Sequence, residues 1–129
     1  MPLAYTILYV GDVAATLDFY EKAFGLQRKM LHESGDYGEL DTGSTTLSFS
    51  SLNLMKQIGK NPGKPVRGNP CFEIAFTVED VAAALDRAVQ AGAELVQAAE
   101  DMPWGQTTAY VHDLNGFLVE LCTAMETQP

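Results

Sequence analysis

Two carboxylates stand inside strongly apolar stretches of this sequence, where an ionised side chain without a partner is costly. Glu73 falls within residues 71–78, and Glu120 falls within residues 117–123. Two interpretations are open. Either the carboxylates project into solvent from a one-sided sheet, or they share a cavity in which they bind a metal ion, hold a cationic ligand or exchange a proton.

A repeated segment indicates how these residues are positioned. Residues 9–18 return as residues 77–86, with seven of the ten positions identical at an offset of 68. In each copy an apolar strand pattern ends before an aspartate, Asp12 or Asp80, that can cap the helical pattern that follows. A repeat of this length predicts two copies of one half-domain rather than a solenoid.

Each copy is predicted to hold one strand, one helix and three further strands, so the fold class is α+β. In module one, residues 4–51, we expect a helix over residues 13–24, ended by Gly25, and strands at 4–10, 26–33, 37–41 and 45–51. In module two, residues 71–123, we expect a helix over residues 80–91 and strands at 71–78, 93–98, 106–112 and 117–123. A match of Trp104-Gly105 to Tyr37-Gly38 at an offset of 67 extends the repeat past the helix.

Residues 52–70 are the predicted linker between the modules. Glycines and prolines interrupt any regular element there, and the segment holds half of the basic residues. It is interpreted either as a solvated connector or as a lid over a surface. By length, residues 1–129 are expected to form a single domain.

Composition narrows the classes of partner. Seventeen acidic and eight basic side chains give a formal charge of −9, which repels nucleic acid and anionic membrane surfaces. The sequence shows no signal peptide and no membrane-spanning run, and Cys71 and Cys122 are interpreted as reduced thiols. We therefore expect a cytoplasmic protein whose partner is a small molecule.

Strand periodicity predicts which side chains share a face. The apolar positions of each strand must cover the helix, among them Phe72, Ile74, Val119 and Leu121. The opposite face then carries mainly polar or small residues, which are Thr46, Ser48, Ser50, Glu73, Ala75, Thr77, Leu118, Glu120 and Cys122. The repeat makes Tyr5 the counterpart of Glu73 and Ser48 that of Glu120, so four positions are expected to face one concavity.

The chain resembles the vicinal oxygen chelate superfamily, which includes glyoxalase I, bleomycin-resistance proteins and extradiol dioxygenases. The resemblance spans nearly the whole sequence and is carried by residues 5–13, 19–20, 24–26, 103–105 and 113–121. It implies two βαβββ modules whose sheets curve into an open barrel, often completed in a homodimer. In metal-dependent members a divalent ion is held from the first, fourth, fifth and eighth strands, which implies positions Tyr5, Ser48, Glu73 and Glu120.

The sequence departs from the enzyme pattern at three of these positions. The resemblance implies histidines where Tyr5 and Glu73 stand and a carboxylate where Ser48 stands, so only Glu120 is of the expected type. Such a set is poor for zinc or nickel, and it cannot supply the iron triad of the dioxygenases. The expected cofactor is none, or a weakly held divalent ion such as Mg²⁺. His32 and His112 fall outside these positions and are interpreted as surface or turn residues.

Two functional hypotheses follow. The first is a metal-free protein that captures a cationic or aromatic compound in a groove of a homodimer. Its expected ligand-binding residues are Tyr5, Tyr9, Ser48, Trp104 and Tyr110. The alternative is a divalent-metal-dependent lyase or isomerase in which Glu73 and Glu120 are both metal ligands and catalytic residues.

Overall fold

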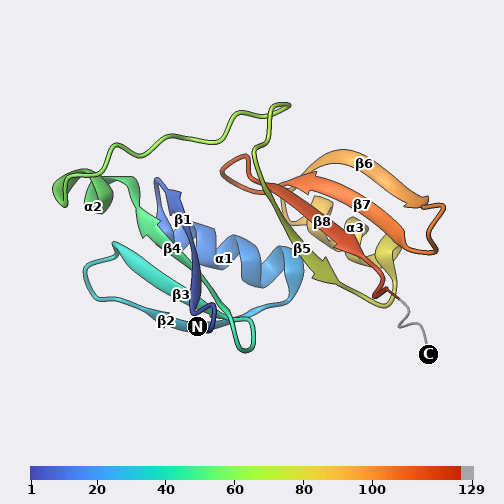
Figure 1. Cartoon of the computed structure of the whole chain (residues 1–129), viewed down its shortest axis with the longest axis horizontal. Helices are drawn as coiled ribbons and strands as arrows, with labels where there is room; N and C mark the ends of the chain where they lie inside the picture. Colours follow the sequence, from blue (N-terminus) through green and yellow to red (C-terminus); the bar gives the residue numbers. More distant parts are fainter. Residues whose placement is uncertain (126–129) are drawn as a thin grey trace. The chain divides into compact units, whose positions relative to one another are not determined.

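The computed structural model of the protein describes residues 1–125, and within them the chain divides into two compact units. The units are Met1–Lys64 and Pro65–Pro129, and each contains one four-stranded sheet with a helix beside it (Figure 1). The predicted α+β fold of two βαβββ modules is confirmed. None of the helices in the described part of the chain is long and apolar enough to cross a membrane.

The first unit runs from strand to helix to three strands. These elements are β1 (Tyr5–Val10), α1 (Val13–Phe24), β2 (Gln27–Leu31), β3 (Tyr37–Asp41) and β4 (Thr46–Ser51). The strand order is β1-β4-β3-β2, with β1 parallel to β4 and the other pairs antiparallel. The side chain of Asp12 accepts a hydrogen bond of 3.0 Å from the Ala15 amide, and Gly25 ends α1 at a φ of 69°.

The second unit repeats this plan. Its elements are β5 (Glu73–Thr77), α3 (Val81–Gln90), β6 (Glu94–Asp101), β7 (Thr107–His112) and β8 (Leu118–Cys122). The order is β5-β8-β7-β6, with β5 parallel to β8. Asp80 caps α3 as Asp12 caps α1, because its side chain accepts a 3.0 Å hydrogen bond from the Ala83 amide.

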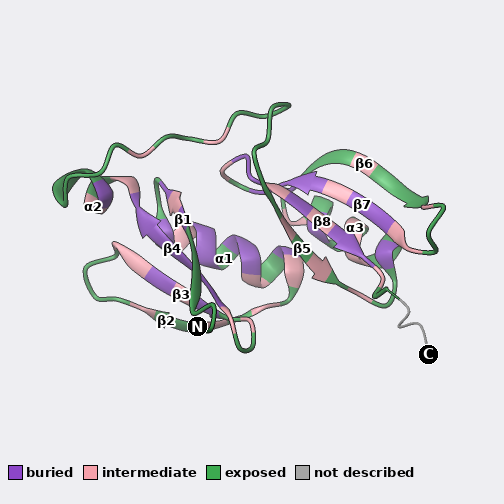
Figure 2. Ribbon diagram, in the orientation of Figure 1, coloured by how far each residue is buried: buried purple, intermediate pink, exposed green. Residues whose placement is uncertain are grey.

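One helix packs on one face of each sheet. Buried residues gather on α1, β4, β7 and β8 (Figure 2). In the first unit Leu17 and Phe49 are fully buried, and in the second Val119 and Leu121 are buried, as their strand positions predict. The predicted core positions of β5 are less buried, since Ile74 and Phe76 are only half-buried. Phe72, which precedes β5, stays 45% exposed, although its ring lies 5.8 Å from that of Phe117.

The predicted linker contains a helix, so the expectation of an irregular segment over residues 52–70 is wrong at its start. Helix α2 spans Leu52–Gln57 directly after β4. Ser51 nucleates it, since its hydroxyl accepts from the Leu54 amide at 3.0 Å and donates to Asp36 at 2.6 Å. Met55 buries the apolar side of α2, a signal too short to read as helical periodicity.

The end of the linker is fastened to the second unit through Glu94. Arg67 donates to the Glu94 carboxylate at 3.3 Å, and His112 lies 2.6 Å from the same oxygen. His112 is only 7% exposed, so its interpretation as a surface or turn residue is wrong, whereas His32 is exposed. The hydrogen bond from His112 is the main reason that the pKa of Glu94 is lowered.

Strand register also corrects the far end of the repeat. Tyr37 pairs with Ser50 on β4, and the equivalent pair in the second unit is Thr108 with Cys122. Trp104 instead lies in the turn between β6 and β7. Trp104 and Tyr37 are therefore similar in sequence context, but they do not occupy equivalent positions in the two units.

Gly38 is the position where α1 comes closest to its sheet. A Cβ atom added there lies 2.6 Å from Leu17 Cδ1 and 3.1 Å from Val13 Cγ1. We predict that Gly38→Ala lowers the free energy of unfolding by about 1–2 kcal/mol, because an extra methyl group overpacks this contact. Urea denaturation followed by circular dichroism measures the difference.

The matched control is Gly63→Ala, because no atom lies within 4 Å of a Cβ added at Gly63. This variant is expected to unfold within about 0.5 kcal/mol of the parent. Equal stability of the two variants would contradict the close helix–sheet contact at Gly38.

Candidate functional site

The open face of the second sheet, the face away from α3, gathers the two carboxylates found in the sequence. In the parallel pair of β5 and β8, Glu73 lies opposite Leu118 and Ala75 lies opposite Glu120. Alternation along both strands places Glu73 and Glu120 on one face, while Val119 and Leu121 point to the core. Tyr110 of β7 lies opposite Glu120 and belongs to the same face.

Glu73 and Glu120 are close enough to share a hydrogen bond. This bond, together with partial burial and the negative charge of Glu120, raises the pKa of Glu73 to about 7. The cause is elementary, because two carboxylates in contact cannot both be ionised cheaply and a shared proton relieves the repulsion. Near neutral pH this site therefore stands at the point of losing its proton.

The neighbours of Glu120 respond to the same charge. Burial, followed by the charges of Glu120 and Glu73, raises the pKa of Tyr110 to about 12. Burial and Glu120 likewise raise the pKa of the Cys122 thiol. Both groups stay neutral at physiological pH, and the ion pairs seen in residues 1–125 include neither Glu73 nor Glu120. The open face thus carries acidic charge with no basic side chain paired to it.

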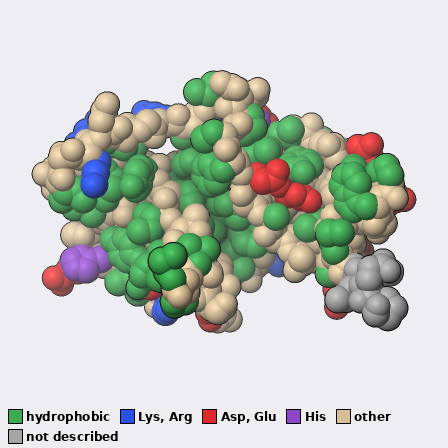
Figure 3. Space-filling view, viewed as in Figure 1, with side chains coloured by type: hydrophobic (Ala, Val, Ile, Leu, Met, Phe, Trp, Pro, Cys, Tyr) green, Lys and Arg blue, Asp and Glu red, His purple; other side chains and the backbone are tan. Residues whose placement is uncertain are grey.

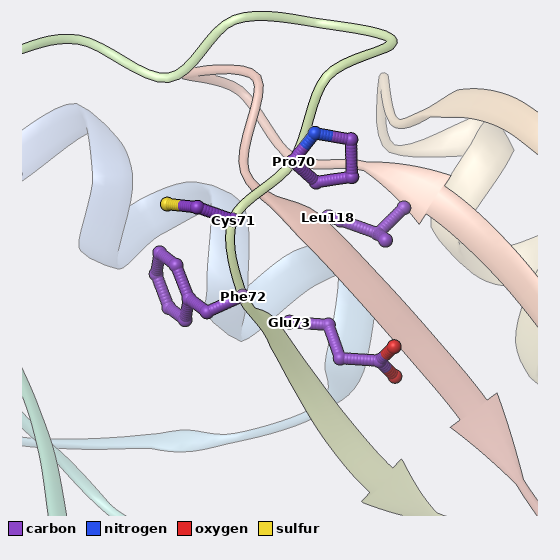
Figure 4. Close-up of a pocket in the computed structure, with 5 residues that line it drawn as sticks. All are labelled: Pro70, Cys71, Phe72, Glu73 and Leu118. Atoms are coloured by element: carbon purple, nitrogen blue, oxygen red, sulfur yellow. The ribbon is translucent and has the colours of Figure 1, made fainter.

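A cleft of about 260 Å³ lies beside Glu73. Its lining residues are Pro70, Cys71, Phe72, Glu73 and Leu118. Figure 4 shows the Glu73 and Leu118 side chains on one side of the strand and those of Cys71 and Phe72 on the other. Over β5 and β8 the surface carries an acidic group set among apolar side chains (Figure 3). This combination suits a ligand with both a positive charge and an apolar body.

The other predicted ligand-binding residues lie elsewhere. Tyr5, Tyr9 and Ser48 belong to the open face of the first sheet, where Tyr5 is 51% exposed and Ser48 is fully buried. Trp104 is 60% exposed, and its indole N–H donates to Gln106 at 2.7 Å within the β6–β7 turn. The structure therefore brings Tyr110 to the carboxylate pair, and the described contacts do not bring Trp104 there.

Glu39 is a polar residue of the first sheet that the sequence analysis missed. It lies on β3 opposite Ser48, and its side chain is only 13% exposed. Tyr37 donates a hydrogen bond to its carboxylate at 2.7 Å. Alternation with the buried positions Gly38 and Leu40 was the available signal, because it sets Glu39 on the open face with Tyr37.

The donors around Glu120 do not fit a zinc or nickel ion. Such ions usually take three or four ligands drawn from imidazole, thiolate and carboxylate groups. In residues 1–125 no three side chains of His, Cys, Asp or Glu come together in a metal-binding arrangement. The second sheet offers two carboxylates that share a hydrogen bond, with a protonated phenol beside them.

Comparison with known proteins gives the family. Residues 3–121 match the family model described as the Glyoxalase/Bleomycin resistance protein/Dioxygenase superfamily. A protein from Neisseria meningitidis named lactoylglutathione lyase is 32% identical over 93% of this chain and 88% of its own length. One from Synechocystis named probable lactoylglutathione lyase is 31% identical over 94% of each chain.

Solved structures show the same fold. A glyoxalase-related enzyme from Fulvimarina pelagi superposes with a TM-score of 0.82 at 24% identity, covering 95% of this chain and 88% of its own. TioX from Micromonospora superposes with a TM-score of 0.73 at 24% identity, covering 95% and 98%. The chain therefore belongs to the glyoxalase/bleomycin resistance protein/dioxygenase superfamily, which confirms its resemblance to the vicinal oxygen chelate proteins.

Proposed function

We propose that this protein captures a small organic cation without a metal ion, with the Glu73–Glu120 pair on the open face of the second sheet as its anchor. The observation that carries the proposal is the contact between these two carboxylates, which raises the pKa of Glu73 to about 7. A positive group placed between them relieves the repulsion that the proton now relieves.

The surroundings of the pair supply the rest of the ligand chemistry. Leu118 lines the cleft on the same side of the strand as Glu73 and offers apolar contact to the body of the ligand. Tyr110, held protonated beside Glu120, presents an aromatic ring and a hydroxyl. Ammonium compounds with an aromatic or aliphatic body are therefore the proposed ligand class.

Removal of either carboxylate tests the anchor. We predict that Glu73→Gln and Glu120→Gln each weaken the binding of benzylammonium at least about tenfold, which corresponds to about 1.4 kcal/mol. Glu73 is exposed and Glu120 is half-buried, so both carboxylates can be reached by the cation. Isothermal titration calorimetry on chelator-treated protein measures the change.

Asp86→Asn is the charge-matched control, because Asp86 is exposed on α3 and is expected to leave the affinity unchanged. Equal weakening by this control would show that only net charge matters and would contradict a defined anchor.

A divalent-metal-dependent lyase or isomerase is the second candidate, favoured by the relatives named lactoylglutathione lyase. In that role Glu120 and Glu73 would hold a divalent ion that polarises oxygens of the substrate, and one of the two carboxylates would be the general base. Elemental analysis of protein purified without chelator separates the two functions. Stoichiometric metal that is lost in Glu73→Gln and Glu120→Gln would replace the capture proposal with the enzyme.

The proposed capture depends on pH through Glu73. Below pH 7 the cation must displace a proton from Glu73, whereas above pH 7 Glu73 has already lost it, and Tyr110 and Cys122 stay neutral throughout. We predict that benzylammonium binds about tenfold more tightly at pH 8 than at pH 6, with release of nearly one proton at pH 6. Calorimetry in two buffers of different ionisation enthalpy counts the protons.

A rise in pH is expected to lower the stability of the folded protein, although it strengthens the binding of the cation. The folded chain keeps a proton on Glu73 that the unfolded chain, with a pKa near 4.5, has lost. Stability without ligand therefore falls as pH rises from about 4.5 through 7. Glu73→Gln removes this dependence, and a variant that kept it would contradict the assignment to Glu73.

We further propose that the protein forms a homodimer and that the partner chain completes the binding groove for the cation. One edge strand of each sheet is β1 or β5, and exposed apolar residues accompany these two edges: Tyr5 and Ile7 on β1, and Phe72 before β5. Exposed apolar groups at unpaired sheet edges favour association. Light scattering after size exclusion at micromolar concentration is expected to give twice the 14.0 kDa chain mass, and a monomer contradicts this proposal.

A further inference from the structure

The first sheet carries its own polar cluster, formed by one carboxylate, Glu39, with Tyr37 and Ser48. Its strand positions correspond to those of Tyr110 and Glu120 in the second sheet. Ser48 and Glu120 are equivalent, because they lie opposite Ile7 and Ala75 at matching points of the two parallel strand pairs. Across the next strand Ser48 lies opposite Glu39, while Glu120 lies opposite Tyr110. The first unit thus has its acid on β3 and a hydroxyl on β4, and the second unit has the reverse.

Glu39 and Tyr37 present two acceptor atoms that remain available. The phenol of Tyr37 donates its proton to Glu39 Oε2 at 2.7 Å, so the phenol oxygen keeps lone pairs that can accept. The other carboxylate oxygen, Oε1, has Lys29 Nζ at 3.9 Å, which is too long for a hydrogen bond. An ammonium group with three donors fits between such acceptors.

Lys29 itself indicates the kind of group this cluster attracts. Its side chain is 57% exposed, so its ammonium approaches Glu39 from solvent without being fixed there. An exposed ion pair of this length contributes little to stability. The Lys29 ammonium therefore competes weakly with a ligand ammonium for the Glu39 carboxylate.

Ser48 marks the cluster as incomplete. Its Oγ is buried and is the only such side-chain oxygen or nitrogen in residues 1–125 that lacks a hydrogen-bond partner. The hydroxyl lies near Tyr37 and acts to lower its pKa, although burial and Glu39 raise that pKa overall. A small shift of the Tyr37 ring on ligand binding gives Ser48 a partner and removes the cost of an unpaired buried hydroxyl.

We propose that Glu39, Tyr37 and Ser48 form a second site, on the open face of the first sheet, for the primary ammonium group of a ligand. Glu39 supplies the charge, Tyr37 supplies the second acceptor, and Ser48 supports the Tyr37 ring once the site is filled. All three residues belong to the first unit, and the proposal rests on other observations than those that carry the Glu73–Glu120 anchor.

The test uses amide chemical shifts of the full chain, titrated with n-butylammonium and, separately, with tetramethylammonium. Saturable shifts are expected in the amides of Tyr37–Asp41 and Thr46–Ser51 with the primary amine. Tetramethylammonium has the same charge and no N–H donor, and it is expected to shift them at least tenfold more weakly. Equal responses to both cations, or no saturable response in these strands, would overturn the proposal.

Three variants sharpen the outcome. Glu39→Gln keeps the shape of the side chain and is expected to weaken n-butylammonium binding at least tenfold. Asp41→Asn removes the same charge two residues along β3, where Asp41 is exposed, and is expected to change nothing. Lys29→Met removes the competitor and is expected to tighten binding up to about fivefold. Unchanged binding in Glu39→Gln, or weaker binding in Lys29→Met, rejects the site.

Two further readouts keep the result clear. If Glu39→Gln fails to fold, Tyr37→Phe removes the phenol oxygen as an acceptor, together with the hydrogen bond that it donates to Glu39. This variant is expected to weaken binding at least threefold, and undiminished binding rejects the site. The amide shifts also distinguish this proposal from the proposed function. If the Glu73–Glu120 pair does not bind cations, the amides of Glu73–Thr77 and Leu118–Cys122 will not shift, whereas those of the first unit are still expected to shift.

Discussion

The packing of one helix against one face of each sheet is the constraint on which the rest of this structure depends. Because side chains alternate along a strand, the face that buries Phe49 or Val119 under a helix decides what the opposite face carries. A one-residue slip in register would bury Glu120 under α3 and expose Val119 and Leu121. The core therefore fixes the chemistry of the open faces as firmly as it fixes the fold.

Much of the architecture could be predicted from sequence, because its signals are local. The aspartate caps, the glycine after α1 and the spacing of apolar residues are all set by residues close together in the sequence. The repeat then shows that these elements form two modules. Helix α2 was missed since six residues carry too little periodicity beside a glycine- and proline-rich segment. The burial of His112 was missed because its partner, Glu94, lies on another strand.

The candidate site was predictable only in part, for a related reason. Glu73 and Glu120 could be placed on one face from alternation alone, but their contact depends on the parallel register of β5 and β8. Tyr110 was named among several aromatic residues, and only its pairing with Glu120 sets it apart from Trp104. The family resemblance does not predict Glu39, because in the first unit it implies ligands on β1 and β4, whereas Glu39 lies on β3.

The opposite placement of acid and hydroxyl in the two units changes how such duplicated halves should be compared. A carboxylate that is missing from one position can reappear on the adjacent strand, a few ångströms away, with the hydroxyl taking its former place. What persists between the halves is then an electrostatic potential over a patch of sheet. A comparison residue by residue would find no acid in the first half at the position of Glu120, although a carboxylate stands on the adjacent strand.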